Sequence, residues 1–284
     1  MKDFIREKLC FYSPAFPGKT SGYDIIEMAK KYGARGVEML SFWDELVDCD
    51  YGEAMKLGRC AKESGLYIPC FSLGTVLVGE GADESFARLK RAADICSALE
   101  VPYLHHTIYM SLDPKDVEGR KEDIRKAGVE MALKVSDYAK ARGVKTILED
   151  QGLVFNGVDG YGKLVAMTDG KIGTVLDLGN IMFVDEWAED FGRAFAKNIN
   201  HVHLKDYIRV EKTEPAPTQK YYTTEGGNYL IPCQFGTGSV RFETVKNLLD
   251  EIGYDGYFSM EFDRVMDETT LEKSLEYVAS VFGK

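Results

Sequence analysis

Short apolar runs alternate with amphipathic helical stretches along the whole 284-residue chain, and this alternation restricts the fold more than any other feature. The apolar runs read as buried strands because they are short, rich in β-branched or aromatic residues and bounded by turn residues. Eight runs fit this description: 8–13, 36–40, 67–74, 103–108, 145–152, 173–179, 199–205 and 257–262. The stretches between them carry helical apolar spacing: 24–34, 53–65, 84–100, 122–143, 161–169, 187–198, 241–253 and 270–283.

Strands joined by helices run parallel and are connected by right-handed crossovers. Eight such units favour a closed (β/α)8 TIM barrel over an open doubly wound sheet, and the chain length is near the usual size of that barrel, about 250 residues. The α/β pattern therefore predicts one TIM-barrel domain spanning residues 1–284. Glycines close several helices before the next strand, where a left-handed cap returns the chain to the sheet: Gly33, Gly65, Gly143 and Gly253.

The longest segment without a clear pattern is about 206–238, after the seventh strand. Loops of this length inside a compact domain are usually functional or mobile. In a barrel it lies at the carboxyl ends of the strands, so we interpret it as an irregular loop that covers a substrate.

Four polar residues stand at or near the ends of four consecutive predicted strands, from the fifth to the eighth: Glu149 in KTILED, Asp177 in GTVLDLGN, His203 in HVHLKD and Glu261 in FSMEFD. Burying ionised groups without a partner costs several kcal/mol. Three carboxylates and one imidazole suit a single divalent metal ion, with water or substrate completing its coordination. The four residues are therefore the predicted metal ligands.

Alternate residues on a strand share a face, which separates the two histidines of HVHLKD. His201 lies one layer deeper than His203 and is expected to be a hydrogen-bonded core residue. Lys205 lies nearer the mouth, where its ammonium meets either a substrate oxygen or a strand-end carboxylate.

Further substrate-binding candidates are weaker. His105 and His106 are adjacent, so only one of them points into the barrel, and the sequence does not select which. Asn180 and Arg209 are candidates for contacts to substrate, with a turn cap and a solvated loop arginine as the alternatives. Glu38, in the second run, either faces the same mouth or is a structural carboxylate.

The balance of charges argues against nucleic acid as a partner. The chain has 46 acidic and 35 basic residues, a net charge of −11, and no basic run; such a surface repels polyanions. The six scattered cysteines form no C-x-x-C pair and are expected to be reduced thiols. No secretory signal and no membrane span is visible, so we expect a cytoplasmic protein.

The chain resembles the xylose isomerase-like TIM-barrel superfamily, the sugar phosphate isomerase/epimerase group. The block FGTGSVRFETVKNLLDEIGYDGYFSMEFD (235–263) carries most of the resemblance, with HVHLKD and the strand ending at Glu149 adding to it. The resemblance implies that Glu149, Asp177, His203 and Glu261 bind one divalent ion, Mn, Mg, Co or Zn, with Mn favoured. In the ketose 3-epimerase branch the two glutamates act as acid and base, and positions matching Arg209 and Asn180 contact substrate. The latter is usually histidine there, in D-x-x-H, and DLGN departs from it.

The first expected function is therefore a metal-dependent sugar isomerase or epimerase. It would act on a ketose, keto-inositol or related keto-sugar through an enediolate that the metal stabilises as a Lewis acid. Glu149 and Glu261 would remove and return the proton. The alternative on the same site is a dehydratase or lyase of a keto-polyol. A phosphodiesterase of the AP endonuclease type fits less well, since its zinc cluster needs about five histidines and this chain has four. The expected partners are a small sugar or polyol and copies of the chain in a homodimer or tetramer, without nucleic acid or membrane.

Overall fold

A parallel barrel forms the centre of the molecule. The computed structural model describes residues 2–13, 20–263 and 267–283. Within them, nine strands form one sheet in the order β2-β1-β12-β8-β7-β6-β5-β4-β3, every neighbouring pair parallel. The strands are β1 (Leu9–Phe11), β2 (Gly36–Val37), β3 (Met39–Leu40), β4 (Cys70–Leu73), β5 (Tyr103–His106), β6 (Lys145–Glu149), β7 (Gly173–Asp177), β8 (Ile199–Leu204) and β12 (Phe258–Met260).

The two ends of this sheet, β2 and β3, are pieces of one predicted strand that is interrupted at Glu38. The nine labelled strands therefore correspond to the eight predicted ones, and the sheet is a nearly closed barrel. A parallel bridge from Gly36 to Tyr67 adds to the closure. A Cβ at Gly36 would lie 1.9 Å from the carbonyl oxygen of Tyr67, so glycine is required where the two backbones meet. The predicted (β/α)8 class is confirmed.

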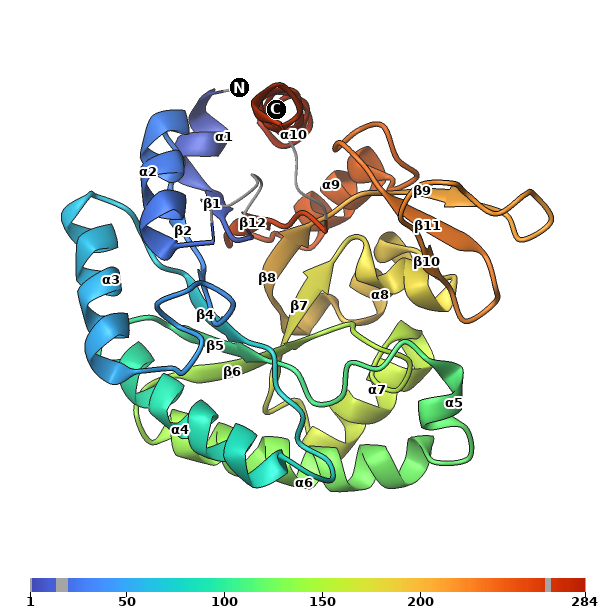
Figure 1. The fold of residues 1–284 in the computed structure, drawn as a ribbon, viewed down its shortest axis with the longest axis horizontal. Helices are drawn as coiled ribbons and strands as arrows, with labels where there is room; N and C mark the ends of the chain where they lie inside the picture. Colours follow the sequence, from blue (N-terminus) through green and yellow to red (C-terminus); the bar gives the residue numbers. More distant parts are fainter. Residues whose placement is uncertain (1, 14–19, 264–266, 284) are drawn as a thin grey trace.

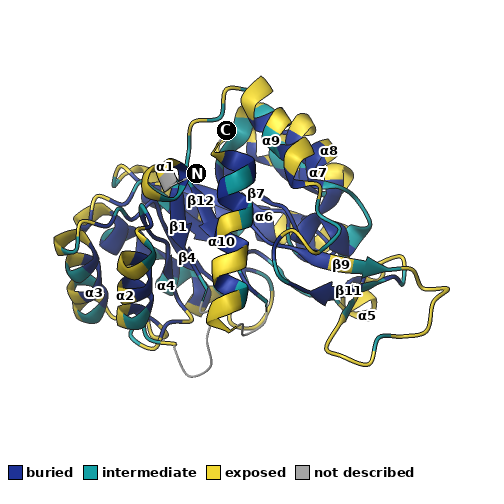
Figure 2. Ribbon diagram, turned by 90° about the horizontal axis from the view of Figure 1, so that it is seen from above, coloured by how far each residue is buried: buried dark blue, intermediate teal, exposed yellow. Residues whose placement is uncertain are grey.

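The helices surround the barrel in sequence order (Figure 1). Each predicted helical stretch contains or overlaps an observed helix: α2 (Gly22–Tyr32), α3 (Tyr51–Glu63), α4 (Ala82–Ala98), α6 (Lys121–Lys140), α7 (Gly157–Thr168), α8 (Ala188–Ala194), α9 (Phe242–Glu251) and α10 (Glu268–Phe282). Their buried faces point to the strands and their exposed faces outward (Figure 2). The predicted stretch 187–198 also contains the short helix η2 (Ala196–Asn198). The sequence did not predict the short helices α1 (Lys2–Glu7), α5 (Pro114–Val117) and η1 (Asn180–Val184).

The four predicted glycine caps all have left-handed backbone angles, with φ between 66° and 78°. Gly33, for example, caps α2 directly, and its N–H donates to the carbonyls of Ala29 and Lys30. Cap chemistry was therefore a dependable guide to where these helices end.

The segment 206–238 is not irregular, and that prediction is wrong. It contains β9 (Tyr207–Val210), β10 (Tyr222–Thr223) and β11 (Tyr229–Pro232), which form an antiparallel sheet in the order β10-β11-β9. The strands have only two to four residues, too few for a period-two pattern. This small sheet extends from the barrel and contacts η1, where the ring of Phe183 meets those of Tyr207 and Tyr222, and it has exposed loops at its far end (Figures 1 and 2).

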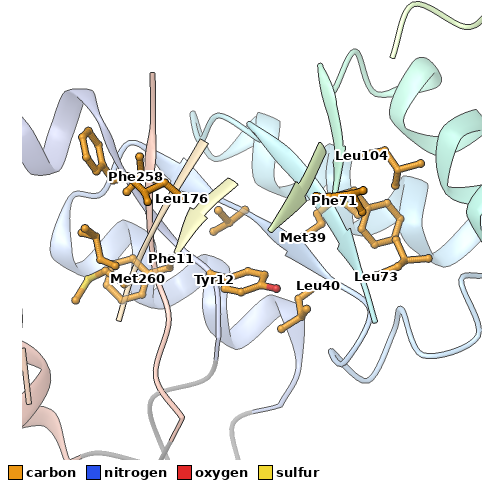
Figure 3. Close-up of a cluster of buried hydrophobic side chains, with 14 of the residues drawn as sticks. Phe11, Tyr12, Met39, Leu40, Phe71, Leu73, Leu104, Leu176, Phe258 and Met260 are labelled. Carbon is orange, nitrogen blue, oxygen red and sulfur yellow. The ribbon is translucent and has the colours of Figure 1, made fainter. Parts of the chain in front are cut away.

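Side chains alternate between the two faces of the barrel strands. Apolar residues that face the helices form the main core, part of which is visible in Figure 3. Phe71, Leu73 and Leu104 pack together on one side there, and Phe258 and Met260 on another, with the phenol of Tyr12 between the two groups. Inside the barrel, the cluster of Cys70, Ile147 and Val175 forms an apolar layer. The polar residues two positions further along β4, β6 and β7 lie above this layer, as the period of two predicts.

No helix in the described part of the chain has the length and apolar character needed to cross a bilayer. All six cysteines are thiols, as expected from their spacing.

Candidate metal centre

Four polar side chains converge at the carboxyl ends of the strands. Glu149 ends β6, Asp177 ends β7, His203 lies on β8 and Glu261 directly follows β12. His203 Nδ1 lies 3.3 Å from Glu149 Oε2, 3.8 Å from Asp177 Oδ2 and 3.2 Å from Glu261 Oε2. One ligand atom from each residue lies within 4.8 Å of the others. The structure thus brings all four predicted ligands together.

The atoms that face one another in this cluster lack hydrogen-bond partners: Glu149 Oε2, Asp177 Oδ2, His203 Nδ1 and Glu261 Oε2. Three of the residues are buried, and the side chain of Glu261 is 18% exposed. Buried polar atoms normally find partners, and three neighbouring carboxylates repel one another unless a cation lies between them. The donor set fits one divalent ion. The cluster can therefore hold a metal.

The turn after β7 orients Asp177. Its Oδ1 accepts from the N–H of Gly179 at 2.8 Å and of Asn180 at 2.7 Å. Its own N–H donates to Asp150 Oδ1 at 2.9 Å. With Oδ1 occupied, Oδ2 is the oxygen left to face the other ligands, so the DLGN sequence aims the carboxylate.

Burial and neighbouring charges shift the pKa values of Asp177 and His203. Burial, with the charges of Glu261 and Glu149, raises the pKa of Asp177 to about 7 against the opposing charge of Lys205. Burial lowers the pKa of His203, but three carboxylates, with Glu38 the largest contributor, outweigh it and hold that pKa well above its ordinary value. The metal-free cluster therefore binds protons at neutral pH.

Metal affinity is expected to fall as the pH is lowered from about 8 to about 6, because ligands must lose their protons to bind. The raised pKa values of Asp177 and His203 mean that both compete with the ion in this range. Each displaced proton weakens apparent affinity by about tenfold per pH unit below the group's pKa. Titration with Mn²⁺ across this range would measure the slope, and calorimetry in two buffers of different ionisation enthalpy would count the protons. Affinity independent of pH would contradict this linkage.

Lys205 lies within the cluster. Its buried ammonium is 2.7 Å from Glu261 Oε1 and 3.3 Å from Asp177 Oδ2. It also donates to Asn180 Oδ1 at 3.0 Å, which leaves the buried Asn180 Nδ2 without a partner. Burial lowers the pKa of Lys205, but the surrounding carboxylates raise it well above its ordinary value, so the amine stays charged. Lys205 contacts the ligand carboxylates, and the amide of Asn180 lies beside it.

Of the adjacent histidines, His105 faces the barrel. Its Nε2 lies 3.8 Å from Glu149 Oε1, and its ring meets that of His203 edge-on with centroids 5.4 Å apart. The ring of His106 points the other way: its Nδ1 lies 3.2 Å from the carbonyl of Thr107, and it lines a cavity of about 10 Å³ with Leu164 of α7. His105 is therefore the one that remains a candidate for substrate contact.

Arg209 lies on β9, away from the four ligands. Its guanidinium is 3.4 Å from carboxylate oxygens of both Asp185 and Glu211, and 5.9 Å from the ring centre of Trp187. Among the described residues, the structure does not bring Arg209 against the cluster.

Two features of the site were missed at the sequence level. The ring centre of Tyr12, just after β1, lies 4.7 Å from that of His203. The sequence signal that could have found it is the alternation of faces along the strand, which puts Tyr12 on the same face as Cys10. Asp206, just after β8, accepts hydrogen bonds from the N–H groups of Gly236, Gly238 and Val240. A Cβ at Gly238 would lie 2.1 Å from Asp206 Oδ1, which explains the second glycine of FGTG.

Together these features define a (β/α)8 barrel with a candidate divalent-metal centre at the carboxyl ends of its strands. A family model described as xylose isomerase-like TIM barrel matches residues 26–281. The chain belongs to this family, and the resemblance read from the sequence is confirmed.

The chain is also similar to individual proteins. It is 28% identical over 180 residues to inosose dehydratase of Clostridium perfringens, a match that covers 61% of this chain and only 58% of that enzyme. D-psicose 3-epimerase of Clostridium cellulolyticum H10, solved with D-tagatose, superposes with a TM-score of 0.74 at 16% identity, covering 97% of this chain and 99% of the other. The IOLI protein, solved with a zinc atom, superposes with a TM-score of 0.73 at 20% identity, covering 97% and 98%. The two structures support the fold.

Proposed function

We propose that the protein is a divalent-metal-dependent dehydratase that removes water from a keto-inositol or a related keto-polyol. The observation that carries this proposal is the position of Lys205, whose ammonium lies 2.7 Å from Glu261 Oε1. The similarity to inosose dehydratases supports the substrate class. The sequence alone favoured isomerisation, with dehydration as the alternative; the contacts of Lys205 reverse that order.

The two glutamates occupy unequal positions. Glu261 has Oε1 against the Lys205 ammonium and Oε2 among the ligand atoms, so both of its oxygens are engaged. Glu149 turns Oε2 to the ligands, while its Oε1 lies 3.8 Å from His105 Nε2, beyond hydrogen-bonding distance. Only Glu149 therefore has an oxygen available to take a proton from substrate, and Lys205 is the group that has a proton to give.

This asymmetry suits an elimination. Glu149 Oε1 takes the proton from the carbon next to the substrate carbonyl and leaves an enolate. The carbon–carbon double bond then forms as the bond to the β-hydroxyl breaks. The departing hydroxide takes a proton from the Lys205 ammonium and leaves as water. The proton held by Glu149 then returns to Lys205, so the net change is the loss of one water. Asn180 Nδ2 donates to a substrate oxygen and its Oδ1 holds the amine.

Glu149, Asp177, His203 and Glu261 would hold the metal, one divalent ion of Mn, Mg, Co or Zn with Mn favoured. When bound, the ion supplies Lewis-acid stabilisation of negative charge on the substrate oxygens.

Isomerisation or epimerisation of a ketose is the second candidate. Glu149 ends β6 and Glu261 directly follows β12, and these two strands are separated by β7 and β8 in the barrel. The two carboxylates approach the site from different sides, as a two-base mechanism needs. The fold shared with D-psicose 3-epimerase is consistent with it. A trinuclear zinc phosphodiesterase is disfavoured, because His106 and His201 both turn away from the cluster.

The two candidates differ in the mass of their products. The Mn²⁺-loaded protein is incubated in deuterated water with a panel of keto-inositols and ketoses. Dehydration gives a product lighter by one water, followed by mass spectrometry and by absorbance of the new conjugated carbonyl. Isomerisation or epimerisation gives a product with the carbon skeleton and oxygen count of the substrate, carrying deuterium. Product of unchanged formula from every active compound would overturn the dehydratase proposal in favour of the second candidate.

A further inference from the structure

We infer that Glu38 is a positioning residue for the metal centre: it holds His203 with its proton on Nε2 and so presents Nδ1 to the ion. The inference deepens the proposed function and rests on its metal site, but not on the reaction that follows.

The two ring nitrogens of His203 face different partners. Both carboxylate oxygens of Glu38 lie 3.2 Å from His203 Nε2. On the other side of the ring, His203 Nδ1 faces the cluster, 3.2 Å from Glu261 Oε2. A carboxylate only accepts, and an imidazole that binds a metal through Nδ1 keeps one N–H, which is on Nε2. The N–H therefore points to Glu38, and the lone pair on Nδ1 is left for the metal. Such outer carboxylates orient metal-bound histidines and increase their basicity.

Glu38 is itself held in place from two sides. Ser72 Oγ donates to Glu38 Oε1, and His201 Nε2 lies 2.8 Å from Glu38 Oε2. His201 Nε2 is also 2.9 Å from Ser259 Oγ. All of these groups are buried. Because each oxygen of Glu38 has a fixed partner, the carboxylate cannot rotate away from His203 without leaving buried groups unsatisfied.

Glu38 lies between β2 and β3, the two ends of the sheet, where the barrel closes. β2 pairs with β1, and β3 pairs with β4, so the strand changes partner at this residue. The N–H of Glu38 donates to the carbonyl of Phe11 at 2.9 Å. At this interruption the side chain of Glu38 points into the barrel, where it contacts His201 and His203.

Glu38, His201 and His203 also lie close enough to form a second metal site. Their contacts argue against it. Both imidazole Nε2 atoms point at the Glu38 carboxylate, and Ser72 donates to the same group. The atoms that a cation would need are already hydrogen-bonded, whereas the four ligand atoms of the cluster above have no hydrogen-bond partner.

The test compares Glu38→Gln with His201→Gln, two buried changes of which only the first removes the charge that faces His203. Zn²⁺ and Co²⁺ affinities are measured by competition with a chelator. The tautomer of His203 in the Zn²⁺-loaded protein is read by long-range ¹H–¹⁵N NMR. We expect Glu38→Gln to weaken metal binding by about 10–100-fold and to change the His203 signals. His201→Gln should lower thermal stability while it leaves affinity within about threefold, since the glutamine amide can still donate to Glu38 and the contact between Glu38 and His203 remains. If Glu38→Gln does not fold, Ser72→Ala removes only one donor to Glu38 and should show a smaller loss of affinity in the same direction.

Wild-type affinity and an unchanged His203 spectrum in Glu38→Gln, or in Ser72→Ala if Glu38→Gln does not fold, would overturn the inference. So would a metal-loaded His203 that carries its proton on Nδ1. Failure of the proposed function looks different: the wild-type protein would bind metal with the Glu38 dependence intact and turn over none of the keto-polyols.

Discussion

Glu149→Gln is expected to reduce turnover of the active keto-polyol by about 10³-fold or more, near the upper range for loss of a general base. The variant keeps the size of the side chain and an oxygen for the metal, but the amide cannot accept the proton from carbon. The loss should appear in kcat, and exchange of the substrate α-hydrogen with solvent should disappear with it. Steady-state kinetics in deuterated water measure both together.

Glu149 is also a candidate ligand, so metal content is the necessary control. Elemental analysis of the variant at saturating Mn²⁺ separates a lost base from a lost ion. Glu261→Gln is the matched comparison, because Glu261 shares the ligand role but has both oxygens engaged. In an elimination, Glu261→Gln should retain α-hydrogen exchange. If exchange survived in Glu149→Gln and vanished in Glu261→Gln, the base would be Glu261 and the assignment to Glu149 would be wrong.

Lys205→Met is expected to lower dehydration by about 10²–10⁴-fold, the usual contribution of a positioned proton donor. Methionine has a similar length but no proton to give to the departing hydroxide. Glu149 is untouched, so α-hydrogen exchange should continue without elimination, and the ratio of exchange to product should rise. NMR of the substrate in deuterated water measures that ratio.

Metal binding provides the control for Lys205→Met. The ammonium lies 3.3 Å from Asp177 Oδ2 and 2.7 Å from Glu261 Oε1, where it repels a cation held by the same carboxylates. Its removal should leave Mn²⁺ affinity unchanged or higher, so any loss of activity is not a loss of metal. Dehydration at the wild-type rate in this variant would show that the proton comes from another group.

The fold could be predicted because its signals are local. Each strand and helix has its own apolar period, and glycines such as Gly33 and Gly143 mark helix ends by backbone conformation alone. The four ligands could be predicted for a related reason: in a parallel barrel all strands end at one rim, so polar residues at strand ends meet there.

The remaining parts of the site depend on side-chain orientation across the barrel. The choice between His105 and His106 follows from the register of β5 against β4 and β6, which is a long-range property. The role of Glu38 depends on a strand that changes partner in its middle. Arg209 was predicted to contact substrate, but it lies on β9, which pairs antiparallel with β11, and its guanidinium contacts Asp185 and Glu211 instead.

The hydrogen bonds of Asp206 bear on how the segment 206–238 can vary in length without changing the barrel. Its carboxylate accepts from the N–H groups of Gly236 and Gly238 at 2.9 Å and 3.1 Å, so it joins the end of β8 to the residues that lead into α9. Ser239 N donates to the carbonyl of Tyr207 at 2.7 Å and doubles the connection. Both ends of the segment 206–238 are therefore held together at one point on the rim of the barrel. When the two ends of a loop are held together, the entropic cost of closing the loop grows slowly, by about 0.6 kcal/mol for each doubling of the number of residues. We therefore expect that the far end of the segment 206–238 can be lengthened, shortened or replaced while the barrel strands keep their geometry.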